Sequence, residues 1–235
     1  MRFSEYTQLR EKRRGIYFYG LYRRLEQIKK LIDQLLHQGE NEFLNIVDFG
    51  CADNLTLDYL LSIFGDKIQN GIGLDIFPNG KPPQTEQEKI SFIKIDLFKD
   101  FPYPLEDCSF NVAICSAFFK HHPFPERFMS EVWRILQGGG YVIILDPSPW
   151  VMAIGMKLKY FEGRYSPNVW NRNLVSLSGS KKGMEYKFEE ILYERYWIAP
   201  NRFLYNCGME KLFSRRLVQY FGLHQSLLLK KVGLE

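Results

Sequence analysis

The sequence has 235 residues, of which 46% are hydrophobic and 25% are charged, and its net charge is +4. This length suits one large domain with ample material for a core, and no apolar run reaches the roughly 18–20 residues of a membrane-spanning helix. The start of the chain lacks the apolar stretch of a signal peptide, and its four cysteines show neither C-x-x-C pairs nor zinc-ligand spacing. We therefore predict a cytoplasmic protein with reduced thiols and no metal centre.

The charge is distributed unevenly along the chain. Residues 1–40 contain nine Lys and Arg against five Asp and Glu, and residues 150–235 contain fourteen against seven. Residues 41–149 contain eight against fifteen. An acidic centre is thus flanked by basic ends, which indicates that different parts of the protein face different ligands.

Taken in chain order, residues 21–37 place leucine and isoleucine at helical spacing and predict an amphipathic helix. The runs "LNIVDFG", "NGIGLDIF", "ISFIKIDLF" and "FNVAICSAFF" are short and apolar, as buried parallel strands are. A helical pattern, "TLDYLLSIFG", follows the first of them. The segment "FPERFMSEVWRIL" predicts a further helix, "QGGG" its end, and "YVIILDP" a fifth strand.

Strands that alternate with helices predict an α/β fold with a doubly wound, mostly parallel seven-stranded sheet of the Rossmann-like type. We expect one domain over residues 1–235. It would consist of an N-terminal helical segment (1–44), a ligand-binding core (45–150), an insert after strand five (151–183), and C-terminal strands and helix (184–235). The insert breaks the alternating pattern and is expected to form a lid over the substrate.

A turn of small residues follows the first strand. In a doubly wound sheet, ligands bind beyond the carboxyl ends of the strands. Gly50, Cys51 and Ala52 would let the backbone approach such a ligand closely. Asp75 ends the second strand, where an acidic residue can accept hydrogen bonds from both hydroxyls of a ribose, and Asp96 ends the third, near the expected base. The pattern predicts a nucleoside site.

The turn reads G-C-A-D-N-L, which differs from the G-x-G-x-x-G of dinucleotide sites, and no P-loop lysine is present. A cofactor without pyrophosphate needs fewer glycines, and S-adenosylmethionine fits that description. "IVDFGCADN" resembles the first motif of class I S-adenosylmethionine-dependent methyltransferases (small-molecule, type 11-like), and "IGLDIF" resembles the second. "ISFIKIDLFKDFPYPLEDCSFNVAICSAFFKHH" resembles the third and fourth, and "PERFMSEVWRILQGGGYVIILDP" the segments that follow. The resemblance covers residues 45–147.

The resemblance implies S-adenosylmethionine as cofactor and assigns a set of residues to its binding. Asp48 would orient the turn, and Asn54 would either contact the cofactor or cap the following helix. Ala52 stands where the family usually has glycine, and its methyl group would weaken or abolish cofactor use. The cofactor-binding residues expected from the resemblance are Asp48, Gly50, Cys51, Ala52, Asn54, Asp75, Ile76, Asp96, Leu97 and Cys115.

His121 and His122 follow the fourth strand, where the family's acceptor meets the methyl group. A histidine can take a proton from a hydroxyl nucleophile near neutral pH, and the alternative is a purely structural role. We therefore expect methylation, at oxygen, of a small or lipid-linked acceptor, and the basic residues of 151–183 suit an anionic one. Two alternatives are an RNA methyltransferase that holds phosphates with the basic, aromatic flanks and a non-catalytic S-adenosylmethionine-binding protein. The acidic centre disfavours nucleic acid.

Overall fold

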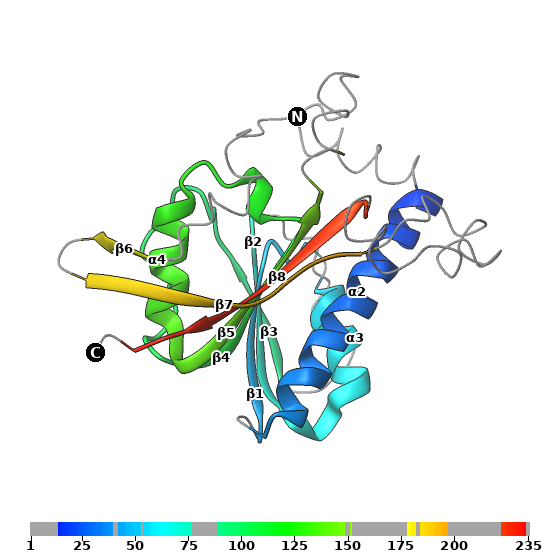
Figure 1. The fold of residues 1–235 in the computed structure, drawn as a ribbon, viewed down its shortest axis with the longest axis horizontal. Helices are drawn as coiled ribbons and strands as arrows, with labels where there is room; N and C mark the ends of the chain where they lie inside the picture. The colour runs from blue at the N-terminus through cyan, green and yellow to red at the C-terminus, as the bar shows by residue number, and fades with distance from the viewer. Residues whose placement is uncertain are drawn as a thin grey trace.

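The computed structural model describes residues 14–39, 42–52, 54–76, 89–148, 151, 178–181, 184–196 and 222–233. Its centre is an eight-stranded sheet with helices on both faces (Figure 1). The strands are β1 (Leu44–Phe49), β2 (Ile68–Asp75), β3 (Ile90–Lys94), β4 (Phe110–Ser116), β5 (Leu136–Pro147), β6 (Ser178–Lys181), β7 (Met184–Tyr196) and β8 (His224–Lys231). The helices are α2 (Arg14–His37), α3 (Leu55–Phe64) and α4 (Pro125–Ile135), with short 3-10 helices η1 (Gly65–Lys67) and η2 (Phe119–His121).

The strand order is β3-β2-β1-β4-β5-β8-β7-β6. The first five strands in this order pair in parallel, and β8 pairs antiparallel with both β5 and β7. The predicted Rossmann-like sheet is confirmed: seven strands run from β3 to β7, and β6 adds an eighth by pairing antiparallel with β7. The order reverses at β1, between β2 and β4, which is where a doubly wound sheet binds its ligand.

Two apolar clusters fill the two sides of the sheet. On one side, leucine and isoleucine side chains of α2 and α3 pack against β1, β4 and β5. These side chains recur every three or four residues in α2, so one face of that helix is buried while Tyr22 and Lys30 on another are exposed. On the other side, α4 contributes Phe128 and Val132 to a second cluster with the inner residues of β1 and β5.

Two predicted boundaries are wrong. The N-terminal helix begins at Arg14, earlier than the expected start at residue 21. The glycines of "QGGG" do not end α4 in a loop, because α4 ends at Ile135 and β5 begins at once with Leu136. The pairing of β5 with β4 shifts register between Leu136 and Tyr141, so these glycines form an irregular first part of the strand.

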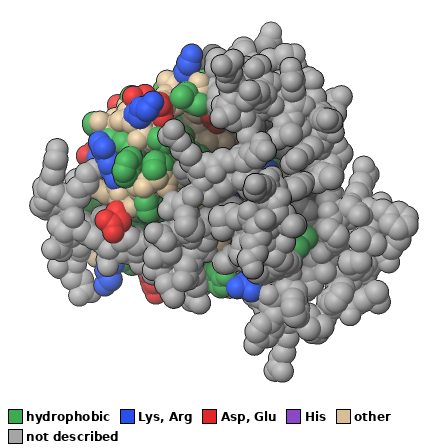
Figure 2. Space-filling view, turned by 90° about the horizontal axis from the view of Figure 1, so that it is seen from above, with side chains coloured by type: hydrophobic (Ala, Val, Ile, Leu, Met, Phe, Trp, Pro, Cys, Tyr) green, Lys and Arg blue, Asp and Glu red, His purple; other side chains and the backbone are tan. Residues whose placement is uncertain are grey.

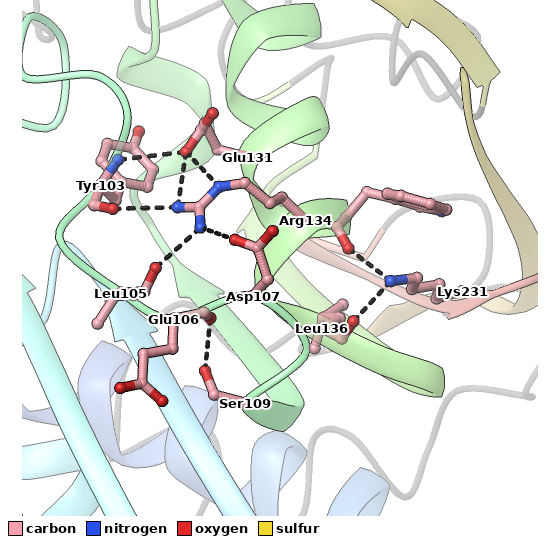
Figure 3. A network of polar contacts seen from close by, with 10 residues as sticks. Tyr103, Leu105, Glu106, Asp107, Ser109, Glu131, Arg134, Leu136 and Lys231 are labelled. Carbon is pink, nitrogen blue, oxygen red and sulfur yellow. Dashed lines mark hydrogen bonds and ion pairs between the residues drawn. The ribbon is translucent and has the colours of Figure 1, made fainter. Parts of the chain in front are cut away.

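Arg134 ties the end of α4 to the loop between β3 and β4. Its guanidinium donates to the backbone carbonyls of Tyr103 (3.0 Å) and Leu105 (2.8 Å) and to the carboxylates of Glu131 (3.0 Å) and Asp107, as Figure 3 shows. Tyr103, held by this network, donates its hydroxyl to the carbonyl of Leu97 at 2.9 Å. The network thus holds the segment that follows β3 in position.

The carboxyl ends of the parallel strands and the first turns of α2 lie on the upper side of Figure 1. Figure 2 views the molecule from that side, and its described surface mixes hydrophobic side chains with both signs of charge. Among the described residues, no helix is long and apolar enough to cross a membrane. Most of the expected lid (151–183) and residues 197–221 of the C-terminal segment, where a helix was expected, lie outside the described residues.

Candidate cofactor and acceptor site

The small-residue turn lies at the carboxyl ends of β1 and β2, as predicted. Backbone N–H groups of Gly50 and Cys51 donate to the carbonyl of Leu74, at 2.8 and 3.3 Å. The next N–H, of Ala52, donates to Oδ2 of Asp75 at 2.9 Å. Asp75 therefore holds the turn in place and brings a carboxylate to the expected ribose position.

Ala52 has φ of 52°, in the left-handed region that glycine adopts without steric cost. We expect Ala52→Gly to leave the turn intact and to raise the free energy of unfolding by about 0.5–1 kcal/mol, because the left-handed strain is removed. Cofactor affinity should stay equal or increase. Urea unfolding and calorimetric titration check both values, and a clear loss of affinity would show that the turn is built around alanine.

Asn54 also adopts the left-handed conformation, with φ of 59°, immediately before α3. It occupies the N-cap position of α3, and its backbone carbonyl accepts the N–H of Asp58 at 3.0 Å, but its side chain makes no capping hydrogen bond. The side chain is fully buried, and neither its amide nitrogen nor its amide oxygen has a hydrogen-bond partner among the described residues. It lies against Gly73, where an added Cβ would meet Asn54 Oδ1 at 1.8 Å. A buried amide with no partner is costly, and a bound polar ligand would satisfy it.

The reason for glycine at position 50 differs from the expectation. Its φ is 73°, and a Cβ there would lie 2.5 Å from the ring of Phe118. Glycine is therefore needed at position 50 because the Phe118 ring of this chain, and not a ligand, lies close to its backbone. Phe118 in turn stacks on Phe98 with ring centroids 5.8 Å apart, which places an aromatic wall beside the turn.

Asp96 and Leu97 follow β3 and are largely engaged by their own loop. Asp96 Oδ1 accepts the N–H of Phe98 at 3.0 Å, and Oδ2 pairs with the exposed Lys99 at 3.1 Å. The carbonyl of Leu97 accepts the hydroxyl of Tyr103. The ion pair of Asp96 with Lys99 lies at the surface, so a ligand can replace Lys99 there. Leu97 can contribute to the site mainly by packing, because its side chain is buried.

The remaining expected cofactor residues differ in exposure. Ile76 directly follows Asp75 and is 42% exposed, so its side chain is available to a base. Asp48 is buried in β1, and Cys115 is buried in β4. Burial, with the nearby carboxylates of Asp48 and Asp75, raises the pKa of the Cys51 thiol, and burial raises that of Cys115. Both thiols therefore stay uncharged and contribute to the site only by packing.

The expected catalytic role of His122 is wrong on this geometry. The ring is fully buried, Nε2 lies 3.1 Å from the carbonyl of Leu97, and Nδ1 accepts the N–H of Phe124 at 3.1 Å. Burial lowers its pKa to about 4. Both nitrogens are occupied, so His122 packs among aromatic rings and takes no proton from an acceptor. The backbone of His121 ends η2, and its side chain lies outside the described part of the structure.

Because the pKa of His122 falls from 6.5 to about 4 on folding, the unfolded chain binds a proton at a pH where the folded chain does not. This contribution to stability is complete above pH 6.5 and is lost as the pH falls towards 4. We expect the stability difference between wild type and His122→Gln, measured by urea unfolding, to shrink between pH 7 and pH 5. An equal difference at both pH values would contradict a neutral buried His122.

A buried ion pair that the sequence did not reveal lies at the carboxyl ends of β4 and β5. Asp146 is 4% exposed, and its Oδ2 accepts the backbone N–H of Lys120 at 3.0 Å. The Lys120 ammonium lies 3.9 Å from Asp146 Oδ1, which has no hydrogen-bond partner among the described residues. Burial raises the pKa of Asp146 and lowers that of Lys120, each pulled back by the other's charge. The one available signal was an aspartate ending the apolar run "YVIILDP".

The site described above lies at the carboxyl ends of the parallel strands. A cleft lies elsewhere, between two helices. It has a volume of about 510 Å³ and is lined by residues of α2 and α3: Glu26, Lys29, Lys30, Asp33, Gln34, His37 and Tyr59. None of the expected site residues lines it. No group of three or more His, Cys, Asp or Glu that could hold a metal ion occurs within the described ranges.

Comparison with known proteins identifies the domain that carries this fold. A family model described as a methyltransferase domain matches residues 47–144, from β1 to β5. Residues 47–144 therefore form a methyltransferase domain. The chain is thus an enzyme of methyl transfer, and its cofactor is S-adenosylmethionine. Sequence comparison with curated proteins gives no match.

Solved structures share the fold of this methyltransferase at low sequence identity. A chain in the complex of the Haloferax volcanii Trm112 methyltransferase activator with a candidate methyltransferase has 15% identity and a TM-score of 0.59, covering 95% of this chain and 98% of that one. A candidate sarcosine dimethylglycine methyltransferase from Galdieria sulphuraria has 16% identity and a TM-score of 0.57, covering 88% and 86%. An S-adenosylmethionine-dependent methyltransferase from Mesorhizobium loti has 17% identity and a TM-score of 0.52, covering 81% of this chain and 92% of that one.

The residues of the methyltransferase domain fit the cofactor on two counts. Asn54 has a buried amide whose donor and acceptor are both unsatisfied among the described residues, at the carboxyl ends of β1 and β2. Gly73 leaves the space that this amide and the Cys51 sulfur occupy, since any Cβ there would clash with both. The turn thus holds a buried amide with unmet hydrogen bonds at the point where the strand order reverses.

Proposed function

We propose that this methyltransferase methylates a hydroxyl oxygen of a small or lipid-linked acceptor, bound at the carboxyl ends of β4 and β5. One observation carries the proposal. Asp146 is a buried carboxylate at this edge, its Oδ1 accepts no hydrogen bond from a described residue, and burial raises its pKa towards neutrality. A carboxylate in that state is suited to accept a proton near neutral pH.

The cofactor, in this proposal, is held at the ends of β1, β2 and β3. Asp75 accepts the ribose hydroxyls while it fixes the turn through Ala52. Asn54 supplies its amide to the methionine part, and Ile76 packs on the base. The other residues expected at the cofactor contribute backbone and shape: Asp48, Gly50, Cys51, Asp96, Leu97 and Cys115.

When bound, S-adenosylmethionine supplies a methyl group on a positively charged sulfur. The acceptor's oxygen would form the new bond to that methyl carbon while the carbon–sulfur bond breaks and its electron pair stays on sulfur. Asp146 takes the hydroxyl proton and becomes neutral, and before that step the Lys120 ammonium, 3.9 Å from Oδ1, pairs with its negative charge. Phe118 and the rings next to it exclude water from the reacting atoms. The chain thus provides alignment, a dry wall and a proton acceptor.

The test supplies methyl-labelled S-adenosylmethionine and a panel of phenols and hydroxy acids, with and without an alkyl chain, beside matched amines and an RNA oligonucleotide. We expect label on hydroxyl oxygen only. Asp146→Asn should lower the rate about a hundredfold or more while cofactor affinity is retained. Label on the amines or the RNA, or an unchanged rate in Asp146→Asn, would contradict the proposal. Exposed Asp66, replaced in the same way, is the control.

Residues 151–183 remain our proposed lid, and the division of the chain into the four segments defined from the sequence remains a proposal too. A lid is expected because methyl transfer requires that water be kept out once both ligands are bound.

A further inference from the structure

Five elements bring polar side chains together around Asp146. Arg24 comes from α2, Lys120 from η2, Asp146 from β5, Tyr196 from the end of β7 and His224 from the start of β8. His224 is paired in register with both Pro147 and Tyr196. Its ring lies 5.9 Å from the Tyr196 ring. We call these five side chains the edge cluster.

Two members of the edge cluster have unsatisfied donors. Tyr196 is 8% exposed, and its hydroxyl has no hydrogen-bond partner among the described residues. The buried Nε–H of Arg24 also lacks one in the described part of the chain. A buried polar group without a partner is costly. The group that satisfies a tyrosine hydroxyl and a guanidinium at once must be a hydrogen-bond acceptor, and an oxyanion is the best one.

The charges around the cluster favour the same kind of ligand. Arg24 and Lys120 are cationic, and Arg23 adds a third positive charge that acts on Tyr196. Asp146 is the carboxylate within the cluster. Glu194, which also acts on Tyr196, is already bound by Lys30 at 2.7 Å and by Gln27.

The two aromatic members keep their protons in place. Burial, together with Arg24 and Lys120, holds the pKa of His224 well below its ordinary value, so this ring adds no charge. Burial raises the pKa of Tyr196, which therefore stays a donor. The described charges within and facing the cluster thus leave positive charge in excess. Because Arg24 is only partly buried, a ligand from solvent can reach this charge.

We propose that Arg24 and Tyr196 bind the oxyanion of the acceptor, a carboxylate or a phosphate, while the hydroxyl to be methylated faces Asp146. This rests on the proposed function and narrows its substrate class to acceptors that carry both a hydroxyl and an oxyanion. The oxyanion supplies the negative charge that the cluster lacks. It also accepts hydrogen bonds from the two unsatisfied donors, the Tyr196 hydroxyl and the Arg24 Nε–H.

The experiment measures the thermal unfolding midpoint of the full chain with increasing sodium phosphate or sodium acetate, against sodium chloride at matched ionic strength. A ligand that binds only the folded state raises this midpoint. We expect at least one of the two anions to raise it beyond chloride, and the more effective one identifies the anionic group. Apparent affinity should fall about tenfold in Arg24→Gln and about threefold to tenfold in Tyr196→Phe. Tyr22→Phe, an exposed tyrosine of the same helix as Arg24, should match wild type.

The inference is overturned if neither anion exceeds chloride, or if Arg24→Gln and Tyr196→Phe respond as wild type does. Tyr196→Phe keeps the ring and serves where Arg24→Gln fails to fold. A failure here with hydroxyl methylation intact removes only the oxyanion site. Anion binding that persists while amines or RNA are methylated removes the proposed function instead, so the two failures are distinguishable.

Discussion

Replacing Asp75 by alanine is expected to raise the dissociation constant for S-adenosylmethionine at least about tenfold, because losing a hydrogen bond to a charged group costs about 1.5–3 kcal/mol. The loss has two sources in this structure. The ribose hydroxyls lose their acceptor, and the N–H of Ala52 loses the carboxylate that it contacts at 2.9 Å.

Asp75→Asn separates these two sources. The amide oxygen of asparagine can still accept the N–H of Ala52, so the turn keeps its support while the negative charge is removed. We expect an affinity between those of wild type and the alanine variant. Asp66→Ala, which changes an exposed aspartate just before β2, is the matched control and should bind as wild type does. Calorimetric titration measures all four proteins, and unchanged affinity in Asp75→Ala would remove Asp75 from the site.

Replacing Arg134 by alanine is expected to lower the free energy of unfolding by about 3 kcal/mol. The Arg134 side chain is 14% exposed, and its guanidinium donates to two backbone carbonyls and two carboxylates, which Figure 3 shows converging on it. Its removal leaves Glu131, which is buried, with an uncompensated charge. Arg134→Lys should recover only part of the loss, because an ammonium cannot reproduce the planar fork of donors.

The control for this prediction lies on the same helix. Arg127 is exposed and makes a cation–π contact to Phe101 at 4.1 Å, so Arg127→Ala should cost about 0.5–1 kcal/mol. Urea unfolding at pH 7 measures each variant. If Arg134→Ala is no less stable than Arg127→Ala, the network does not hold the loop before β4.

The first five strands and the expected cofactor end of the sheet could be predicted because their signals are local. Apolar runs identified β1 to β5, and a small-residue turn with Asp75 at the end of the next strand marked the reversal of strand order. The glycines of β5 were misassigned to a loop because glycine is more common in turns, whereas here strand pairing holds them in a register irregularity.

The acceptor end was predictable only in part. Spacing placed His122 after β4 but could not show that its ring turns into an aromatic core, where both nitrogens find partners. Asp146 and Lys120 are 26 residues apart, and Arg24 and Tyr196 reach them from opposite ends of the chain. No sequence pattern relates such residues, because tertiary packing alone brings them together.

The central claim is that the turn at residues 50–52, with Asp75 and Asn54, holds S-adenosylmethionine even though alanine stands at position 52. Calorimetric titration of the full chain with S-adenosylmethionine tests it most directly. The account predicts saturable binding at one site, weakened at least about tenfold in Asp75→Ala and undiminished in Ala52→Gly. No binding by wild type, with binding restored in Ala52→Gly, would show that the alanine closes the site and would contradict the account.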